Sequence, residues 1–172
     1  MKFFKVMVVA LVAFVSVSAM AGRTDAGTWA TGFNFMYDSS TRSGSQTTLD
    51  LELGYFFAKD NQIGGTFGLE VDDFVETFSV GPRYEFYFDF GGAFVPYIGV
   101  GLQLAHADFT GIGDNTALVG ELSLGVKLFI TENVAVDVAL NAAAATDDIY
   151  VDDKARLDSE DFDFTVGFDF CF

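Results

Sequence analysis

Phe162-Asp163-Phe164-Thr165-Val166-Gly167-Phe168-Asp169-Phe170-Cys171-Phe172 is the stretch of sequence that decides the fold. Every second residue in it is apolar, and the residues between are polar or small. Such alternation predicts a β-strand with one apolar and one polar face. The apolar face of this strand must be covered either by another layer of protein or by lipid.

The same alternation recurs in seven earlier segments, which we predict as the strands 28–37, 47–57, 63–71, 77–88, 94–105, 117–130 and 134–144. No amphipathic helix accompanies them to cover their apolar faces. At about 9–14 residues, each segment is long enough to cross the apolar band of a membrane when tilted. The sequence therefore predicts an all-β fold: an eight-stranded antiparallel up-and-down transmembrane β-barrel, with lipid outside and polar side chains inside.

Residues 1–21 have the pattern of a cleaved signal peptide. Lys2 and Lys5 make the start basic, an apolar run covers 6–17, and small residues precede the expected cut after Ala21. The apolar run has about a dozen residues, against the roughly 20 that a membrane-spanning helix needs. We therefore expect a signal peptide over 1–21 and one barrel domain over 22–172.

The charge of the chain excludes nucleic acid as a partner, and its cysteine content excludes an internal disulfide. The formal net charge is −16, and removal of the two signal lysines makes it more negative still. Nucleic acid is excluded as a partner because a phosphate footprint needs clustered Lys and Arg. The single cysteine, Cys171, can form no internal disulfide, and we expect it to fill space inside the barrel.

The connections between the predicted strands alternate in length. Those at 58–62, 89–93 and 131–133 are short, whereas 38–46, 106–116 and 145–161 are longer and polar. Short periplasmic turns and longer outer loops predict that both termini lie in the periplasm. This orientation places an aromatic girdle at the periplasmic end, made of Trp29, Tyr55, Phe57, Tyr84, Phe86 and Phe88.

Three stretches carry a resemblance to a known family. Gly81-Pro82-Arg83-Tyr84, Pro96-Tyr97-Ile98-Gly99-Val100-Gly101 and the terminal Phe172 resemble recurring parts of the small outer-membrane barrels of the OmpA/OmpX-like type. The resemblance implies an integral protein of the bacterial outer membrane, in contact with its lipid and lipopolysaccharide. It also implies that the barrel-assembly machinery recognises Phe168, Phe170 and Phe172 as an assembly signal. Periplasmic chaperones are expected to bring the unfolded chain to this machinery. We expect a monomer.

An eight-stranded barrel is just wide enough for its own side chains to fill. We predict an interior polar network of Asp50, Glu52, Glu70, Arg83, Glu85, Glu121, Lys127, Asp137, Asp163 and Asp169. Symmetric turns would place Lys127 opposite Asp137, Asp50 opposite Glu70, and Gly99 opposite Arg83. Pro82 interrupts a strand that has no free edge, and a bulge there could shift the alternation locally. The network is either a structural plug, which we favour, or the lining of an ion path.

Residues suited to catalysis or metal binding are few. An acyl hydrolase acting on lipid A would need a nucleophile near a base, and the candidates are His106 and Ser123. The acidic run that contains Asp147, Asp148, Asp152 and Asp153 offers weak oxygen ligands for a divalent cation, and we expect no cofactor. We expect an envelope-structural or surface-interaction role through the outer loops, by adhesion or lipopolysaccharide contact. A narrow channel and a lipid A enzyme are the alternatives.

Overall fold

A computed structural model describes residues 23–41, 44–71, 75–110, 113–151 and 157–172. The predicted signal peptide therefore lies outside the described residues. Eight long strands form the fold: β1 (Trp29–Thr41), β2 (Gly44–Ala58), β3 (Asn61–Val71), β4 (Val75–Tyr87), β5 (Phe94–Phe109), β6 (Gly113–Phe129), β7 (Val134–Ala145) and β10 (Glu160–Cys171). In the part of the chain that is described, no helix is long and apolar enough to cross a membrane.

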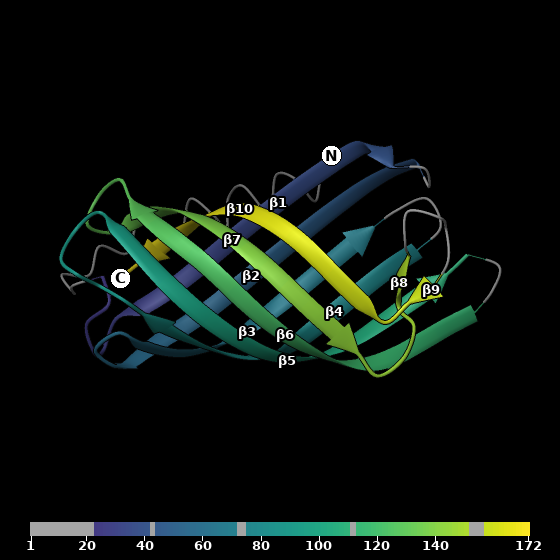
Figure 1. Ribbon diagram of the computed structural model, residues 1–172, viewed down its shortest axis with the longest axis horizontal. Helices are drawn as coiled ribbons and strands as arrows, with labels where there is room; N and C mark the ends of the chain where they lie inside the picture. The colour runs from purple at the N-terminus through teal and green to yellow at the C-terminus, as the bar shows by residue number, and fades with distance from the viewer. Residues whose placement is uncertain (1–22, 42–43, 72–74, 111–112, 152–156) are drawn as a thin grey trace.

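The long strands close into one antiparallel barrel in the order β1-β10-β7-β6-β5-β4-β3-β2 (Figure 1). The seam is the pairing of the first strand with the last, in which Ala30 lies opposite Cys171. Trp29 and Phe172 exchange both backbone hydrogen bonds there, each 2.8 Å long. The predicted eight-stranded up-and-down barrel is thus confirmed.

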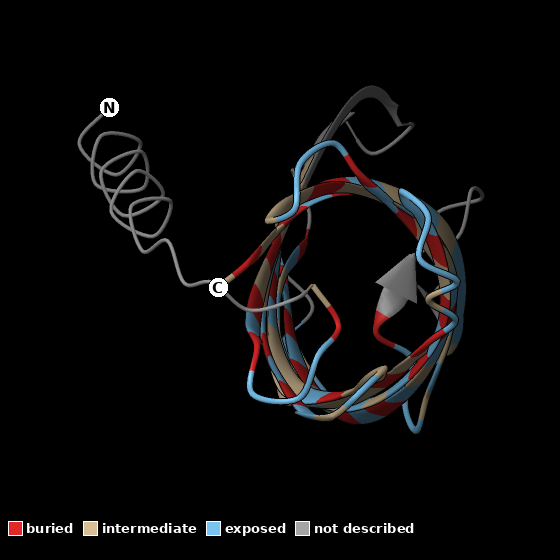
Figure 2. Cartoon of the chain, turned by 90° about the vertical axis from the view of Figure 1, so that its left-hand side faces the viewer, coloured by how far each residue is buried: buried red, intermediate tan, exposed pale blue. Residues whose placement is uncertain are grey.

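Burial alternates along the strands, as the red, tan and pale-blue bands of Figure 2 show, because successive side chains point to the two surfaces of the barrel. The outward set is large and apolar, for example Leu104, Leu124 and Phe164, each of which is more than half exposed. A soluble protein rarely leaves such a continuous apolar surface in water. The outward face is therefore suited to the hydrocarbon core of a membrane.

Strand lengths differ from the prediction on one side of the barrel. β1 reaches Thr41 and β2 begins at Gly44, while β5 reaches Phe109 and β6 begins at Gly113. Most of the predicted 38–46 and 106–116 loops is therefore strand. A two-stranded hairpin, β8 (Tyr150–Val151) with β9 (Leu157–Asp158), lies within the predicted 145–161 loop. Two-residue strands are too short to give a periodic signal, which is why the sequence did not reveal this hairpin.

The predicted pairing of Asp50 with Glu70 is wrong. Asp50 lies opposite Gly68, and Glu70 lies opposite Thr48. The reason is the connection: Ala58 pairs with Asn61 across a turn whose Asp60 has a left-handed φ of 62°, and the register shifts beside it. The shift amounts to two residues along the ladder, so every side chain keeps its predicted face.

The predicted pairing of Arg83 with Gly99 is also wrong, since Arg83 lies opposite Gly101 and Glu85 opposite Gly99. Gly99 nevertheless makes room for the guanidinium, because a Cβ there would lie 3.1 Å from Arg83 Nη2. Pro82 causes no bulge: it pairs with Gly65, and the β4–β5 register is the same on both sides of it. The alternation therefore continues through Pro82 undisturbed.

Two apolar clusters fill the ends of the interior. We name the ends the terminal end, which carries residues 23–28 and Phe172, and the loop end opposite it. The cluster at the terminal end consists of Ala30, Phe56, Tyr87, Val95, Tyr97, Phe129, Ala135, Ala139 and Cys171. The cluster at the loop end consists of Val75, Ala105, Ala107, Phe109, Ala117, Val119 and Ile149. Polar side chains occupy the interior between the two clusters.

Residues 23–28 fold under the terminal end of the barrel. Thr24 is buried, and its hydroxyl donates a 2.8 Å hydrogen bond to Asp60 Oδ1 in the β2–β3 turn. Arg23 pairs with Asp89 of the β4–β5 connection at 3.6 Å and lies 4.9 Å from the centre of the Phe129 ring. The segment thereby ties two turns together and covers the apolar cluster at this end.

Candidate functional site in the barrel interior

Arg83 is the centre of an ionic layer that crosses the barrel. Its Nε lies 2.9 Å from Glu85 and 3.7 Å from Glu52, and its Nη1 binds Glu121. These carboxylates come from β2, β4 and β6, so a single guanidinium joins three strands. Arginine suits this position because its fork of donors can serve several carboxylates at once.

Lys127 is the second cation of the layer and is almost fully buried. Its Nζ lies 2.9 Å from Asp169, 3.7 Å from Glu85 and 3.8 Å from Asp137. The rings of Tyr87 and Tyr97 flank it, with centroids 5.5 and 5.1 Å away. Lys127 is thus held by three carboxylates and two aromatic faces.

Neutral polar groups complete the layer. Tyr87 donates a hydrogen bond to Glu85, and Tyr97 donates one of 3.0 Å to Asp137. Gln62 donates to Glu52 at 2.9 Å, and the fully buried Ser123 donates to Glu121 at 3.0 Å. Since a buried charge is costly unless it is paired and hydrogen-bonded, these contacts are what allow five carboxylates and two cations to share the interior.

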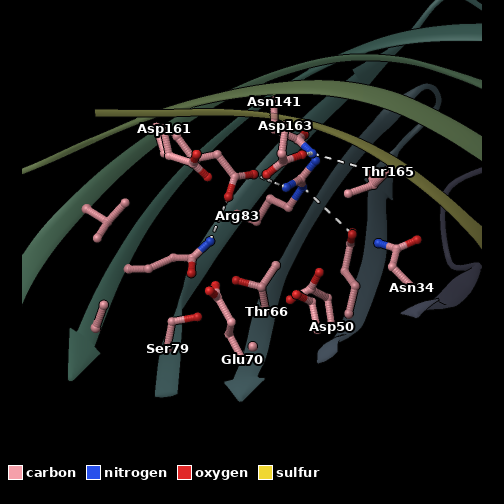
Figure 3. Close-up of a pocket in the computed structure, with 18 of the residues that line it drawn as sticks. Asn34, Asp50, Thr66, Glu70, Ser79, Arg83, Asn141, Asp161, Asp163 and Thr165 are labelled. Atoms are coloured by element: carbon pink, nitrogen blue, oxygen red, sulfur yellow. Dashed lines mark hydrogen bonds and ion pairs between the residues drawn. The ribbon is translucent and has the colours of Figure 1, made fainter. Parts of the chain in front are cut away.

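Beyond the ionic layer, toward the loop end, the interior contains a chamber of about 160 Å³. Figure 3 shows Arg83 between Asp50, Glu70 and Ser79 on one side and Asn141 and Asp163 on the other. The lining of the chamber also includes Ile149 and Val119, which belong to the apolar cluster at the loop end. The chamber is therefore a polar space between the ionic layer and the apolar cluster at the loop end.

The structure divides the predicted polar network into two groups. Seven members meet in the ionic layer: Glu52, Arg83, Glu85, Glu121, Lys127, Asp137 and Asp169. Asp50, Glu70 and Asp163 instead line the chamber. Lys127 does lie opposite Asp137 as predicted, although Asp169 on β10 is its nearest carboxylate.

Some residues of the site were missed by the sequence analysis. Gln62 lies just outside the strand predicted to start at 63, and Ile149 lies in a predicted loop. Thr24 precedes the first predicted strand. Only Gln62 could have been predicted from the sequence, because it continues the series of alternate residues that includes Gly64 and Thr66 on one face of β3.

The predicted catalytic candidates do not meet. His106 is exposed on the outward face, and its Nδ1 lies 2.8 Å from Thr116 Oγ1. Ser123 is buried inside the barrel and lies opposite Gly99. Because the sheet separates the two side chains, the idea that Ser123 could approach His106 is wrong.

The acidic run is described only in part. Asp147 and Asp148 are exposed, whereas Asp152 and Asp153 fall outside the described residues. Among the residues that are described, no group of three His, Cys, Asp or Glu side chains could hold a metal ion. Asp147 and Asp148 therefore face solvent with no metal site around them in the described structure.

The predicted aromatic girdle lies at the terminal end. The ring centres of Trp29 and Tyr55 lie 5.0 Å apart with the rings tilted, and those of Phe57 and Tyr84 lie 6.4 Å apart. The Phe86 and Phe88 rings meet edge to face at 5.0 Å. Amphipathic and aromatic side chains at this height suit the interface between lipid and water. The girdle, the apolar band and the polar interior together describe a membrane barrel.

Comparison with protein families agrees with this architecture, since the sequence profile of the outer membrane protein beta-barrel domain family matches residues 7–170. The chain belongs to this family. It is therefore an outer-membrane β-barrel protein of bacteria. A comparison with curated protein sequences gives no match.

Solved structures of outer-membrane barrels share the fold of this one. The N-terminal barrel domain of Pseudomonas aeruginosa OprF superposes with a TM-score of 0.61 at 19% identity, covering 88% of this chain and all of that one. Neisserial surface protein A superposes with a TM-score of 0.57 at 18% identity, covering 84% of this chain and 96% of that one. OprG of Pseudomonas aeruginosa gives 0.54 at 17% identity, covering 86% and 97%. At these identities the likeness shows the fold alone.

Proposed function

We propose that this outer-membrane barrel is closed to solutes and acts in the envelope through its outer rim, which contacts lipopolysaccharide. The observation that carries the closed lumen is the ionic layer, in which Arg83 and Lys127 join carboxylates of β2, β4, β6, β7 and β10 across the interior. The apolar cluster and residues 23–28 close the terminal end below it. A structural plug explains these contacts better than an ion path does.

The outer rim supports the lipopolysaccharide part of the proposal. With both termini in the periplasm, the loop end lies in the outer leaflet. There Glu76, Asp108 and Asp114 lie side by side on β4, β5 and β6, on the outward face and exposed. Like charges at directly paired positions destabilise a sheet unless a cation lies between them. Divalent cations prefer oxygen ligands, and because these three carboxylates alone form no metal site, phosphate oxygens of the lipid would have to complete the coordination.

The height of this acidic row fits the same partner. Two residues further into the membrane, Phe78, His106 and Thr116 form the next outward row. The row after that is fully apolar and exposed: Val80, Leu104 and Leu118. The carboxylates therefore lie where the apolar band ends, at the level of lipid phosphates. We expect divalent cations to bridge the row to lipopolysaccharide phosphates.

Thermal unfolding in nanodiscs tests this proposal. Calcium should raise the unfolding midpoint in lipopolysaccharide nanodiscs by about 2–4 °C, the shift that about 1 kcal/mol gives in a chain of this size. The Glu76→Gln/Asp108→Asn variant should lose this effect. The matched control Asp25→Asn/Glu132→Gln changes two exposed carboxylates at the terminal end and should keep it. An equal calcium effect in all three proteins, or in phosphatidylglycerol nanodiscs, would contradict the proposal.

Planar-bilayer recordings test the closed lumen separately. We expect no stable large conductance from the purified protein, and any flicker should be small and favour cations, because carboxylates outnumber Arg83 and Lys127 inside. Arg83→Ala should raise the conductance, since it removes the side chain that joins Glu52, Glu85 and Glu121 across the barrel. Lys59→Ala, in an exposed turn, should not. A steady nanosiemens-scale pore in the unmodified protein would favour the channel alternative.

A further inference from the structure

The connection between β4 and β5, residues 88–93, presents the most exposed large apolar side chain of the described structure. This side chain is Phe90, which is 84% exposed at the terminal end of the barrel. The two neighbouring turns at this end have charged tips instead, with Lys59 exposed between β2 and β3 and Glu132 exposed between β6 and β7. Apolar surface is more stable out of water than in it. The β4–β5 connection is therefore suited to an apolar partner, whereas its neighbours are suited to water.

Specific contacts hold this connection in a fixed shape. Oδ1 of Asp89 accepts a 2.7 Å hydrogen bond from the backbone N–H of Gly91, whose left-handed φ of 80° costs glycine little. Oδ2 of Asp89 accepts a 3.2 Å hydrogen bond from the Thr24 hydroxyl and lies 3.6 Å from Nε of Arg23. Phe90 thus lies on an ordered turn, and the single carboxylate of that turn is already paired. The turn can approach lipid without bringing an unpaired charge with it.

The exposed ring is continuous with the outward face of the barrel. Phe88 is exposed and belongs to the aromatic girdle. Phe94 is exposed and lies opposite Leu128, which is on the outward face of β6. Ile130 follows Leu128 by two residues and is exposed as well. We call Phe88, Phe90, Phe94 and Ile130 the turn patch, and it extends the lipid-facing surface around the end of β4, β5 and β6.

We propose that the turn patch enters the membrane at the terminal end, where Phe90 packs at the boundary between the glycerol groups and the acyl chains of phospholipid. The side chains of the patch carry no polar group and therefore suit the acyl chains. The paired Arg23 and Asp89 beside Phe90 suit the headgroups next to them. The assignment to the periplasmic leaflet rests on the orientation proposed above. Because the rest of the outward face stays apolar, loss of the Phe90 ring should change the depth of the turn and not the insertion of the barrel.

Tryptophan fluorescence of the full mature barrel in vesicles tests this depth. Trp29 is the single tryptophan of the sequence, so Trp29→Phe/Phe90→Trp and the matched control Trp29→Phe/Glu132→Trp each carry one tryptophan, at a turn tip. Phospholipid brominated near the upper end of its acyl chains should quench the first variant as strongly as it quenches Trp29 in the unmodified protein. The control should be quenched much less by this lipid and more by aqueous acrylamide. Equal quenching of the two variants by either quencher would overturn the proposal.

The charge of the lipid provides a second test. Since the turn patch is uncharged, brominated phosphatidylcholine and brominated phosphatidylglycerol should quench the tryptophan at position 90 equally. Quenching by the anionic lipid alone would show an electrostatic contact and overturn the assignment to the acyl chain boundary.

Amide NMR signals of the unmodified protein in nanodiscs give a readout that needs no variant. A phospholipid with a nitroxide near the upper end of its acyl chain should broaden the signals of Phe90 and Gly91 more than those of Thr131 and Glu132. Equal broadening of both turns would overturn the proposal. Such a failure would leave the calcium effect at the acidic row untouched, so the two proposals can fail separately.

Discussion

Replacing Lys127 with Met should lower the free energy of unfolding of the barrel by about 3–5 kcal/mol. The Lys127 side chain is 3% exposed, and its ammonium lies among Asp169, Glu85 and Asp137. Methionine fills similar space but leaves these carboxylates buried without their cation. Urea unfolding in lipid vesicles measures the loss. Lys59→Met is the control, because this lysine lies in an exposed turn and should change stability by less than about 0.5 kcal/mol.

Double variants should show which carboxylate matters most to Lys127. Lys127→Met/Asp169→Leu should recover much of the lost stability, because it removes the nearest charge, 2.9 Å away and equally buried. Lys127→Met/Asp137→Leu should recover less, since Asp137 is 3.8 Å away, more exposed and also bonded to Tyr97. Purely additive losses in both cycles would mean that Lys127 forms no energetically coupled pair.

Deleting Phe172 should lower the amount of protein in the outer membrane by much more than its effect on the stability of the assembled barrel can explain. The residue ends the strongest alternating run and matches the assembly signal that the family resemblance implies. In the folded barrel it contributes two backbone hydrogen bonds to Trp29, each worth about 0.5–1.5 kcal/mol net. Outer-membrane levels and urea unfolding of the refolded variant measure the two effects separately.

The control for this deletion removes a different aromatic side chain at the same end of the barrel. Phe90 is 84% exposed at the β4–β5 connection, and Phe90→Ala should leave outer-membrane levels unchanged. Normal levels of the chain that lacks Phe172 would refute the assembly role. If the refolded variant is destabilised enough to explain its lower outer-membrane level, the deletion acts on folding stability and not on recognition by the assembly machinery.

The alternation of side chains was predictable because it is a local property. The residues of a strand themselves show which side chains point inward and which outward. The number of strands and the inward direction of Arg83 and Lys127 could therefore be predicted without knowing which strands pair. Register was less predictable. The left-handed Asp60 and the shift beside it moved Asp50 from Glu70 to Gly68, and no composition rule indicates such a shift.

The partners of the interior charges were harder still to predict. Reasoning from turns compares adjacent strands, and it correctly placed Lys127 opposite Asp137. The shortest ion pair of Lys127 reaches Asp169 on β10, beyond the neighbouring β7. Arg83 on β4 likewise reaches Glu121 on β6 across β5. Such contacts depend on the curvature of the closed barrel, which a one-dimensional pattern does not contain.

The accessibility of the Cys171 thiol can be used to follow the closure of the barrel over time. Cys171 is the single cysteine of the sequence, it is 6% exposed, and it lies opposite Ala30 on the seam where the last strand meets the first. A thiol reagent applied in short pulses reaches this sulfur only until the seam has formed. The fraction of chains that escapes modification at each moment therefore records how many barrels have already sealed, with no label or engineered residue.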